Sequence, residues 1–317
     1  MPKFCRHLPN RGNSTLALVL AWLLLAWQPA WAENYPTKAV QHLFDIVGKA
    51  GDPLAVPTDV AVGTGGRIYV VDGGNHRVVA FGPTGQFLFN IGRAGNGKGE
   101  FKSPVGIGTD AQGRVYVADS GNNRIQIFDG GGAFAGSFPV ASDGRAVRPI
   151  DVAPDQEGKT IYVTGNNNHK VMAFAPGGQL LRQWGGEGLD DGEFRYPASL
   201  AISPDGLIFV VDVMNSRVQV FDKRGRLGFR VGEWGVLPGQ FFRPKGVAVD
   251  KLGWSYVSDS YMDVIQVFDS NYRFQHVLGT GGSLQRFKSP GGLAIDGKDR
   301  LYVVEMLGNK VSVYSLR

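Results

Sequence analysis

Cysteine is almost absent from this sequence of 317 residues, where Cys5 is the only one. It lies in an N-terminal segment that we expect to be cleaved, so the mature chain has no thiol. This excludes disulfides, thiol catalysis, cysteine-ligated metal and covalent c-type haem. It also excludes a lipid anchor on a cysteine at the cleavage site. A thiol-free chain suits an oxidising compartment.

A hydrophobic run long enough to span a bilayer is also missing. Residues 1–15 are basic without any acid, residues 16–27 are an unbroken apolar run, and Ala30-x-Ala32 precedes Glu33. Twelve apolar residues are fewer than the ~20 that span a bilayer. The layout predicts a secretory signal peptide over residues 1–32 and one domain over residues 33–317. An uncleaved anchor is the open alternative. We expect a periplasmic or extracellular protein without stable membrane insertion after cleavage.

Strong net charge is absent once this segment is removed. The whole chain has 33 basic and 28 acidic residues, and three basic residues lie in the segment. The remainder, 33 − 3 = 30 basic against 28 acidic residues, has a net charge of about +2. This gives no argument for a nucleic-acid partner, and export makes one unexpected.

Histidine is scarce as well, with His42, His76, His169 and His276 in the mature chain. We expect His42 and His276 on outer strands, and His76 and His169 at one turn position in two different repeats. Zinc ligands must converge to ~2 Å from one atom, which this placement does not favour. Serine-hydrolase elbow and phosphate-loop motifs are also absent. The sequence therefore predicts no enzyme and no cofactor.

Internal repetition is what the sequence has in abundance. Six prolines, spaced by 47, 45, 48, 47 and 46 residues, each precede a short apolar strand, a glycine-rich turn and two further strands; they are Pro57, Pro104, Pro149, Pro197, Pro244 and Pro290. This period is typical of four-stranded propeller blades. The sixth repeat ends after its third strand, at Arg317, and residues 40–51 resemble a fourth strand. We predict an all-β, six-bladed propeller of antiparallel blades, with the last blade closed by the N-terminal strand.

These elements together resemble the NHL-repeat family over residues 40–317. The motif is proline, a "GVAV"-like strand, "IYVVD", x-x-Asn-x-Arg, "VxVF" and Gly-x-Phe, with the last element at residues 99–101, 192–194 and 239–241. The resemblance implies a six-bladed propeller that acts mostly as a binding platform. It also implies RNA binding in some cytoplasmic members and zinc held by histidines in a related lyase branch, whose ligands this sequence does not match.

The recurring Asp-x-x-Asn-x-Arg turn is predicted to be structural. It occurs as Asp72, Asn75 and Arg77 and twice more at equivalent positions. Residues spread around six blades cannot all contact one substrate atom. We expect the Asp and Asn side chains to bind turn backbone and the Arg to pair with the Asp.

Candidate binding residues precede and follow the prolines. In a four-stranded meander these segments share one face with the turns between second and third strands. They place basic and aromatic side chains around one rim, namely Lys102, Arg148, Arg195, Tyr196, Phe242, Arg243 and Lys288, with Lys245 just inside. Such a ring would raise the local potential.

The inner strands are predicted to line a channel, because alternate residues of a strand face one side. The second residue after each proline includes two carboxylates, Asp59 and Asp151, and a hydroxyl, Ser199. We expect the carboxylates to meet water or Lys245. A cation site is the alternative, since hard cations bind oxygen ligands.

The combined prediction is an exported, non-enzymatic module that presents its basic, aromatic face to a protein, a glycan or an anionic envelope polymer. One alternative is a metal-assisted hydrolase or lyase acting at the channel mouth. Another is a purely structural spacer in a larger assembly.

Overall fold

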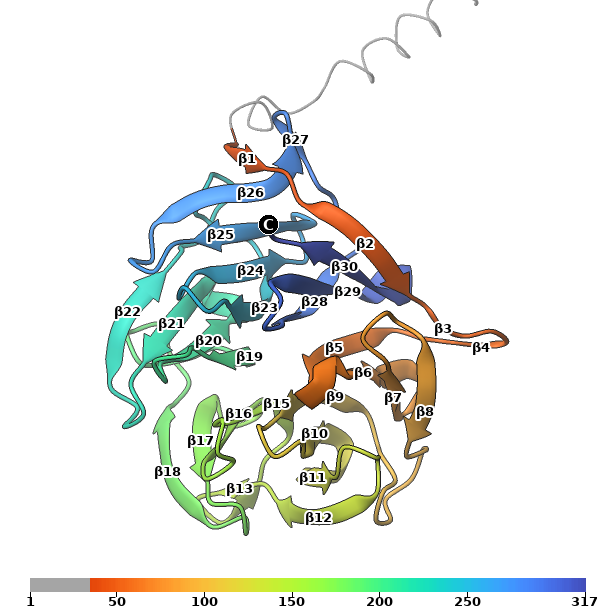
Figure 1. Ribbon diagram of the computed structural model, residues 1–317. Coiled ribbons are helices and arrows are strands. Elements are labelled where there is room, and N and C mark those ends of the chain that lie inside the picture. The colour runs from red at the N-terminus through yellow and green to blue at the C-terminus, as the bar shows by residue number, and fades with distance from the viewer. Residues whose placement is uncertain (1–34) are drawn as a thin grey trace, which may run out of the picture.

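The computed structural model describes residues 35–317, which form a ring of six β-sheets around a central channel (Figure 1). The expected signal peptide lies outside the described residues. Within residues 35–317, no helix has the length and hydropathy needed to cross a bilayer. The all-β, six-bladed fold predicted from the repeat is confirmed.

Each blade is a four-stranded antiparallel sheet whose first strand faces the channel. Blade one contains β5 (Pro57–Val62), β6 (Ile68–Asp72), β7 (Arg77–Phe81) and β8 (Phe87–Ile91). Blade two contains β9 (Pro104–Thr109), β10 (Val115–Asp119), β11 (Arg124–Phe128) and β12 (Phe134–Pro139). Blade three contains β15 (Pro149–Pro154), β16 (Ile161–Gly165), β17 (Lys170–Phe174) and β18 (Leu180–Gly185).

The second half of the ring repeats this order. Blade four contains β19 (Pro197–Ile202), β20 (Ile208–Asp212), β21 (Arg217–Phe221) and β22 (Leu227–Val231). Blade five contains β23 (Pro244–Val249), β24 (Ser255–Asp259), β25 (Val264–Phe268) and β26 (Phe274–Thr280). Blade six contains β28 (Pro290–Ile295), β29 (Arg300–Glu305), β30 (Lys310–Ser315) and the N-terminal strand β2 (Gln41–Ile46).

The N-terminal segment joins the last two blades. Strand β2 pairs antiparallel with β30, which confirms the predicted closure of blade six. The preceding strand β1 (Thr37–Lys38) adds in parallel to the outer edge of β26 in blade five. The Tyr35 side chain is buried beside it, and its hydroxyl donates to the backbone carbonyl of Val236. The chain therefore bridges blades five and six at its start.

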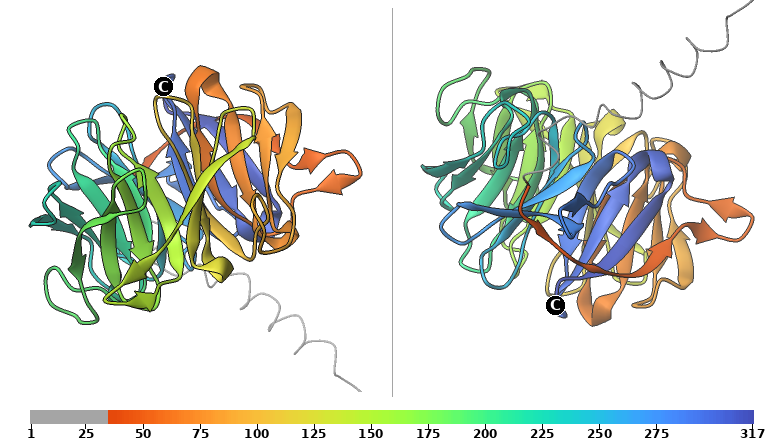
Figure 2. Two further views of the ribbon diagram at one scale, coloured as in Figure 1. Left: turned by 90° about the horizontal axis from the view of Figure 1, so that it is seen from below. Right: turned by 90° about the horizontal axis from the view of Figure 1, so that it is seen from above.

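Small hairpins lie in the connections between blades. Strands β3 (Gly48–Lys49) and β4 (Asp52–Pro53) form a hairpin that projects from the side of the ring (Figure 2). Strands β13 (Ala141–Ser142) and β14 (Arg145–Ala146) form another, and β27 (Ser283–Leu284) pairs with β26. Short 3-10 turns lie at Thr64–Gly66, Gly73–Asn75, Ser120–Asn122, Val213–Asn215 and Met306–Gly308.

The core lies between neighbouring blades. The second strands of blades one, two, four and five are buried at every residue; they are β6, β10, β20 and β24. In the connections that enter blades two, four and five, Phe101, Phe194 and Phe241 are fully buried against the phenylalanine that ends the third strand of the same blade. An aromatic pair thereby anchors each of these three connections to the blade that it enters.

The recurring acidic turn is structural, as predicted. In blade four, the Asp212 carboxylate accepts from Asn215 Nδ2 at 2.9 Å, from Arg217 Nε at 2.8 Å and from the backbone N–H of Arg195 at 2.7 Å. Arg217 also donates to the carbonyls of Asp190 and Glu193. The turn thus ties each hairpin to the connection that enters the same blade.

Removing this carboxylate is expected to destabilise the protein strongly. The variant Asp212→Ala leaves Arg217, which is 4% exposed, without its buried partner. An uncompensated buried charge costs about 3–5 kcal/mol. Chemical denaturation should show a loss of this size.

The control is Arg226→Ala, which removes the exposed ion pair of Arg226 with Asp222 at 2.7 Å and leaves the backbone hydrogen bonds of the Asp222 carboxylate in place. That loss should be at most about 1 kcal/mol. Equal losses in the two variants would contradict a structural role specific to the buried turn.

Candidate functional site

The two faces of the ring differ in the chemistry that they expose. We call the upper face the one that carries the turns between second and third strands and the connections between blades. Within residues 35–317, nine of the fourteen exposed large apolar side chains are on it: Val47, Val56, Leu189, Tyr196, Met214, Trp234, Leu237, Tyr261 and Leu307. Only Leu252 belongs to a turn of the lower face, and the others lie on outer strands. The upper face is therefore the stronger candidate for contacts with a macromolecule.

Four of these side chains, together with the half-buried Phe242, form a continuous surface over blades three to five. Leu189, Met214 and Trp234 line one depression of about 380 Å³. The ring of Trp234 lies 6.1 Å from that of Phe242, which stacks on Tyr261 at 4.0 Å and 24°. Trp234 is 70% exposed and Tyr261 61%. We call the surface formed by Leu189, Met214, Trp234, Phe242 and Tyr261 the aromatic strip.

Of this strip, only Phe242 was predicted from the sequence as a binding residue. Trp234 and Tyr261 were missed because one lies in a connection and the other in a turn. Their adjacency depends on how neighbouring blades pack. A usable signal was present, since large apolar residues in glycine-rich loops are unusual unless they are buried or bind something.

The predicted rim cations are all on the upper face. Lys102, Arg148, Arg195, Arg243 and Lys288 are exposed, whereas Lys245 is half-buried. Among residues 35–317, none of the six side chains forms an ion pair. Their positions come from the buried turns: the backbone N–H of Lys102 donates to Asp119 at 2.8 Å, and that of Lys288 donates to Glu305 at 2.8 Å.

Acidic side chains interrupt this ring beside the aromatic strip. Asp190, Asp191 and Glu233 are exposed there, and Asp191 pairs with Arg230 at 3.1 Å. Tyr196 is separate from the strip and packs edge-on against His169 at 4.8 Å. The upper face therefore carries both signs of charge, with the unpaired cations nearer the channel.

The histidines take the places predicted for them. His76 and His169 each accept the backbone N–H of the residue before the next proline, at 3.0 and 3.1 Å. His42 lies on β2 and His276 on β26, where burial and then the charge of Lys38 lower the pKa of His276 to about 4. In the described part of the chain, no three His, Cys, Asp or Glu side chains are grouped to hold a metal ion.

A pair of buried carboxyl groups narrows the channel. The Asp59 carboxylate accepts backbone N–H groups from Val60 and from Ile107 of the next blade, both at 2.9 Å. Asp151 accepts in the same way from Val152 at 2.7 Å and from Leu200 at 2.8 Å. The two carboxyl groups also lie close enough to affect each other's ionisation. We call Asp59 and Asp151 the carboxyl pair.

A glycine allows this contact. Asp59 and Asp151 belong to blades one and three, and Gly106 occupies the equivalent position in blade two. A β-carbon at Gly106 would overlap the Asp151 carboxylate, and one at Gly292 would overlap that of Asp59. The expectation that the carboxylates meet water or Lys245 stays a prediction, and Lys245 lines the same cavity as the pair. Both carboxylates accept backbone N–H groups.

The buried environment favours the protonated form of the pair. Burial, and then the charge of Asp151, raises the pKa of Asp59 well above its ordinary value. Burial raises the pKa of Asp151 to about 6, opposed by its bonds from Leu200 and Val152. Two carboxylates this close cannot both ionise easily.

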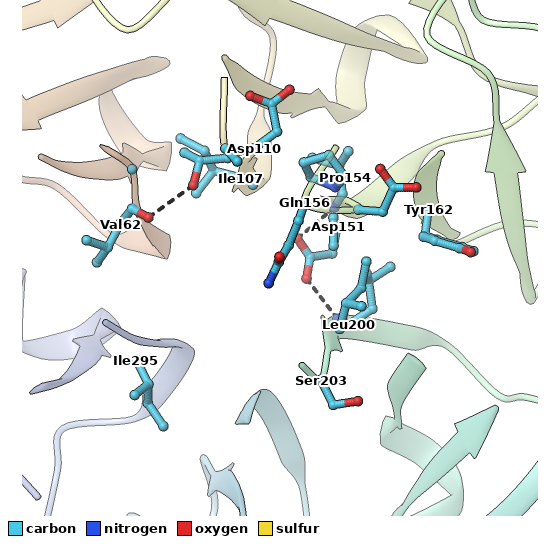
Figure 3. Close-up of a pocket in the computed structure, with 18 of the residues that line it drawn as sticks. Val62, Ile107, Asp110, Asp151, Pro154, Gln156, Tyr162, Leu200, Ser203 and Ile295 are labelled. Atoms are coloured by element: carbon cyan, nitrogen blue, oxygen red, sulfur yellow. Dashed lines mark hydrogen bonds between the residues drawn. The ribbon is translucent and has the colours of Figure 1, made fainter. Parts of the chain in front are cut away.

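Two cavities meet at the carboxyl pair. The lower one has a volume of about 640 Å³ and is lined by polar groups of blades one to four, including Asp155, Gln156 and Ser203 (Figure 3). The upper one has about 130 Å³. Asp59, Asp151 and Ser199 line both. The lower cavity has the size of a small-molecule site.

The carboxyl pair should make stability fall as pH rises. Carboxyl groups of the unfolded chain titrate near pH ~4, whereas Asp151 titrates at about 6 in the folded chain. Between these values the folded state binds more protons, so its free energy of unfolding decreases with increasing pH, by about 3 kcal/mol for Asp151 alone. Denaturation at pH 4.5 and 7.5 measures this change.

The control is the double variant Asp59→Ser/Asp151→Ser, which places the residue of blade four at both positions. Its stability should lack this fall between pH 4.5 and 7.5. An identical pH dependence in both proteins would show that the pair does not hold the proton.

Comparisons with known proteins agree with the ring. The NHL-repeat model matches residues 54–81, 101–128 and 194–221. A gluconolactonase from Xanthomonas campestris is similar in structure, with a TM-score of 0.65 and 19% identity over 91% of this chain and 93% of that one. A protein of unknown function from Bacteroides thetaiotaomicron gives 0.67 and 15% over 89% and 75%. Virginiamycin B lyase from Staphylococcus aureus, with quinupristin, gives 0.60 and 13% over 82% and 80%. These identities indicate a shared fold.

Proposed function

Because this chain is an NHL-repeat propeller, we propose that it is a non-enzymatic binding module whose upper face holds a partner protein. The observation that carries the proposal is the exposed aromatic strip. Trp, Tyr and Arg are enriched at the centres of protein interfaces, where buried aromatic anchors contribute most of the binding energy. Trp234, Tyr261 and the neighbouring Arg243 match that composition.

The mixed charge of this region favours a protein over an anionic polymer. Asp190, Asp191 and Glu233 beside the strip would repel a uniform polyanion. A folded protein can place an apolar group on Trp234 and acidic groups on Arg195 and Arg243 at the same time. Complementary charges of this kind raise the association rate and select the partner. Export, as expected from the leader, would put this encounter outside the cytoplasm.

Loss of the Trp234 ring should weaken binding strongly. Trp234→Ala is expected to weaken the complex by at least 2 kcal/mol, or about thirtyfold, as for interface hot spots. A photoreactive residue at Tyr261 would first identify the partner by crosslinking, and calorimetry with the purified partner would then give the affinities.

Leu252→Ala is the control, because Leu252 is 68% exposed on the lower face. That variant should bind as the parent does. Crosslinks that form equally from a photoreactive residue at position 252, or an unchanged affinity for Trp234→Ala, would contradict the proposal.

The lower cavity supports a second candidate, acid–base catalysis on a small polar molecule. In the shared-proton state, one carboxyl group of the pair can donate a proton while the other accepts one from water. Enzymes occur on this fold, including the gluconolactonase. A screen of small lactones with the parent and the Asp59→Ser/Asp151→Ser variant tests it. Turnover that the double variant lacks would support catalysis, whereas no turnover, or equal turnover in both, would reject it.

A further inference from the structure

The upper cavity is a small chamber on the channel axis, built by all six inner strands. The residues directly after the prolines form its wall, and they are Thr58, Val105, Ile150, Ala198, Lys245 and Gly291. Met306 adds an apolar group, and the carboxyl pair forms the floor. Its volume of about 130 Å³ is roughly ten times the ~10–15 Å³ that one water needs. A molecule of a few heavy atoms fits there.

Lys245 is the one cationic side chain that lines this chamber in the described part of the chain. It is half-buried and has no ion-pair partner within residues 35–317, although lysines in apolar surroundings usually have one. Burial, and then the neighbouring charge of Arg243, lower the pKa of the Lys245 ammonium group. A desolvated amine next to another cation is the arrangement that activates lysine as a nucleophile.

We propose that the upper chamber captures small carbonyl compounds that carry a carboxylate, such as 2-oxo acids, as an imine on Lys245. The exposed guanidinium of Arg243, two residues before Lys245, attracts the carboxylate, as do Arg195 and Lys102 farther out on the face. The apolar wall formed by Val105, Ile150 and Ala198 keeps the amine poorly solvated. The chamber volume restricts the ligand to roughly two to four carbons.

The chemistry requires no co-reactant. The lone pair of the Lys245 nitrogen bonds to the carbonyl carbon, and the electron pair of the C=O bond moves to oxygen, which takes a proton from the carboxyl pair. The nitrogen then returns one proton to the pair. Loss of the hydroxyl group as water, with a second proton from the pair, gives the protonated imine. The balance is one amine, one carbonyl and one net proton from the carboxyl pair converted to one protonated imine and one water.

The test uses the mature protein with glyoxylate and cyanoborohydride, which reduces the imine to a stable carboxymethyl-lysine. Peptide mapping by mass spectrometry then gives the rate at each lysine. At pH 7, Lys245 should react faster than Lys102 and Lys288, because a lowered pKa raises the fraction of neutral amine and the chamber holds the aldehyde beside it. Those two lysines are exposed on the same face and serve as internal controls.

Three variants sharpen the result. Lys245→Arg should lose the fast site, and Arg243→Gln should slow Lys245 at pH 7 but not at pH 10. Trp234→Ala should react as the parent does, which separates this site from protein binding on the aromatic strip. Equal rates at Lys245, Lys102 and Lys288 in the parent protein would overturn the proposal, whether or not the variants fold.

Discussion

The buried carboxylate at the end of each second strand is the interaction on which the molecule depends. It occurs as Asp72, Asp119, Asp212, Asp259 and Glu305, each less than 5% exposed. Each accepts a backbone N–H from the connection that enters its own blade, at distances of 2.6 to 2.8 Å for the shortest bond. Blade three has Gly165 there, and Asn167 accepts the N–H of Arg148 instead. The carboxylate therefore fixes where the residues before each proline emerge.

This arrangement separates the residues that hold the shape from those that can bind. The turn carboxylates and arginines point into the protein, so the exposed positions around them can differ from blade to blade. Blades four and five use that freedom for Trp234, Phe242 and Tyr261, whereas blade two presents Lys102 and Ser103 at the corresponding place. Residues that face the channel axis also differ between blades. The position of Gly106 is occupied by Asp in two other blades and by Ser in a third. The candidate sites therefore arise where residues at equivalent positions of the blades differ.

The repeat made the fold predictable because it carries its information locally. Six prolines at a regular interval mark the inner strands, and alternation within five or six residues marks the rest. The closure of blade six by residues 41–46 could be predicted because the sixth repeat lacks its fourth strand. The contacts across blades were not predictable in the same way. The pairing of Asp59 with Asp151 requires an empty position at Gly106, and the stacking of Phe242 on Tyr261 requires a connection and a turn to meet. Such contacts depend on packing distances that no single repeat encodes.

The closure of blade six also sets an order of events in time. Asp45 accepts a hydrogen bond from Ser312, 267 residues later in the chain. At roughly 5–20 residues per second, a ribosome needs between about 13 and 53 s to make the intervening segment. During that interval residues 41–46 have no strand to pair with, and the ring stays open. The last strand to be synthesised thus decides when the molecule becomes a closed ring.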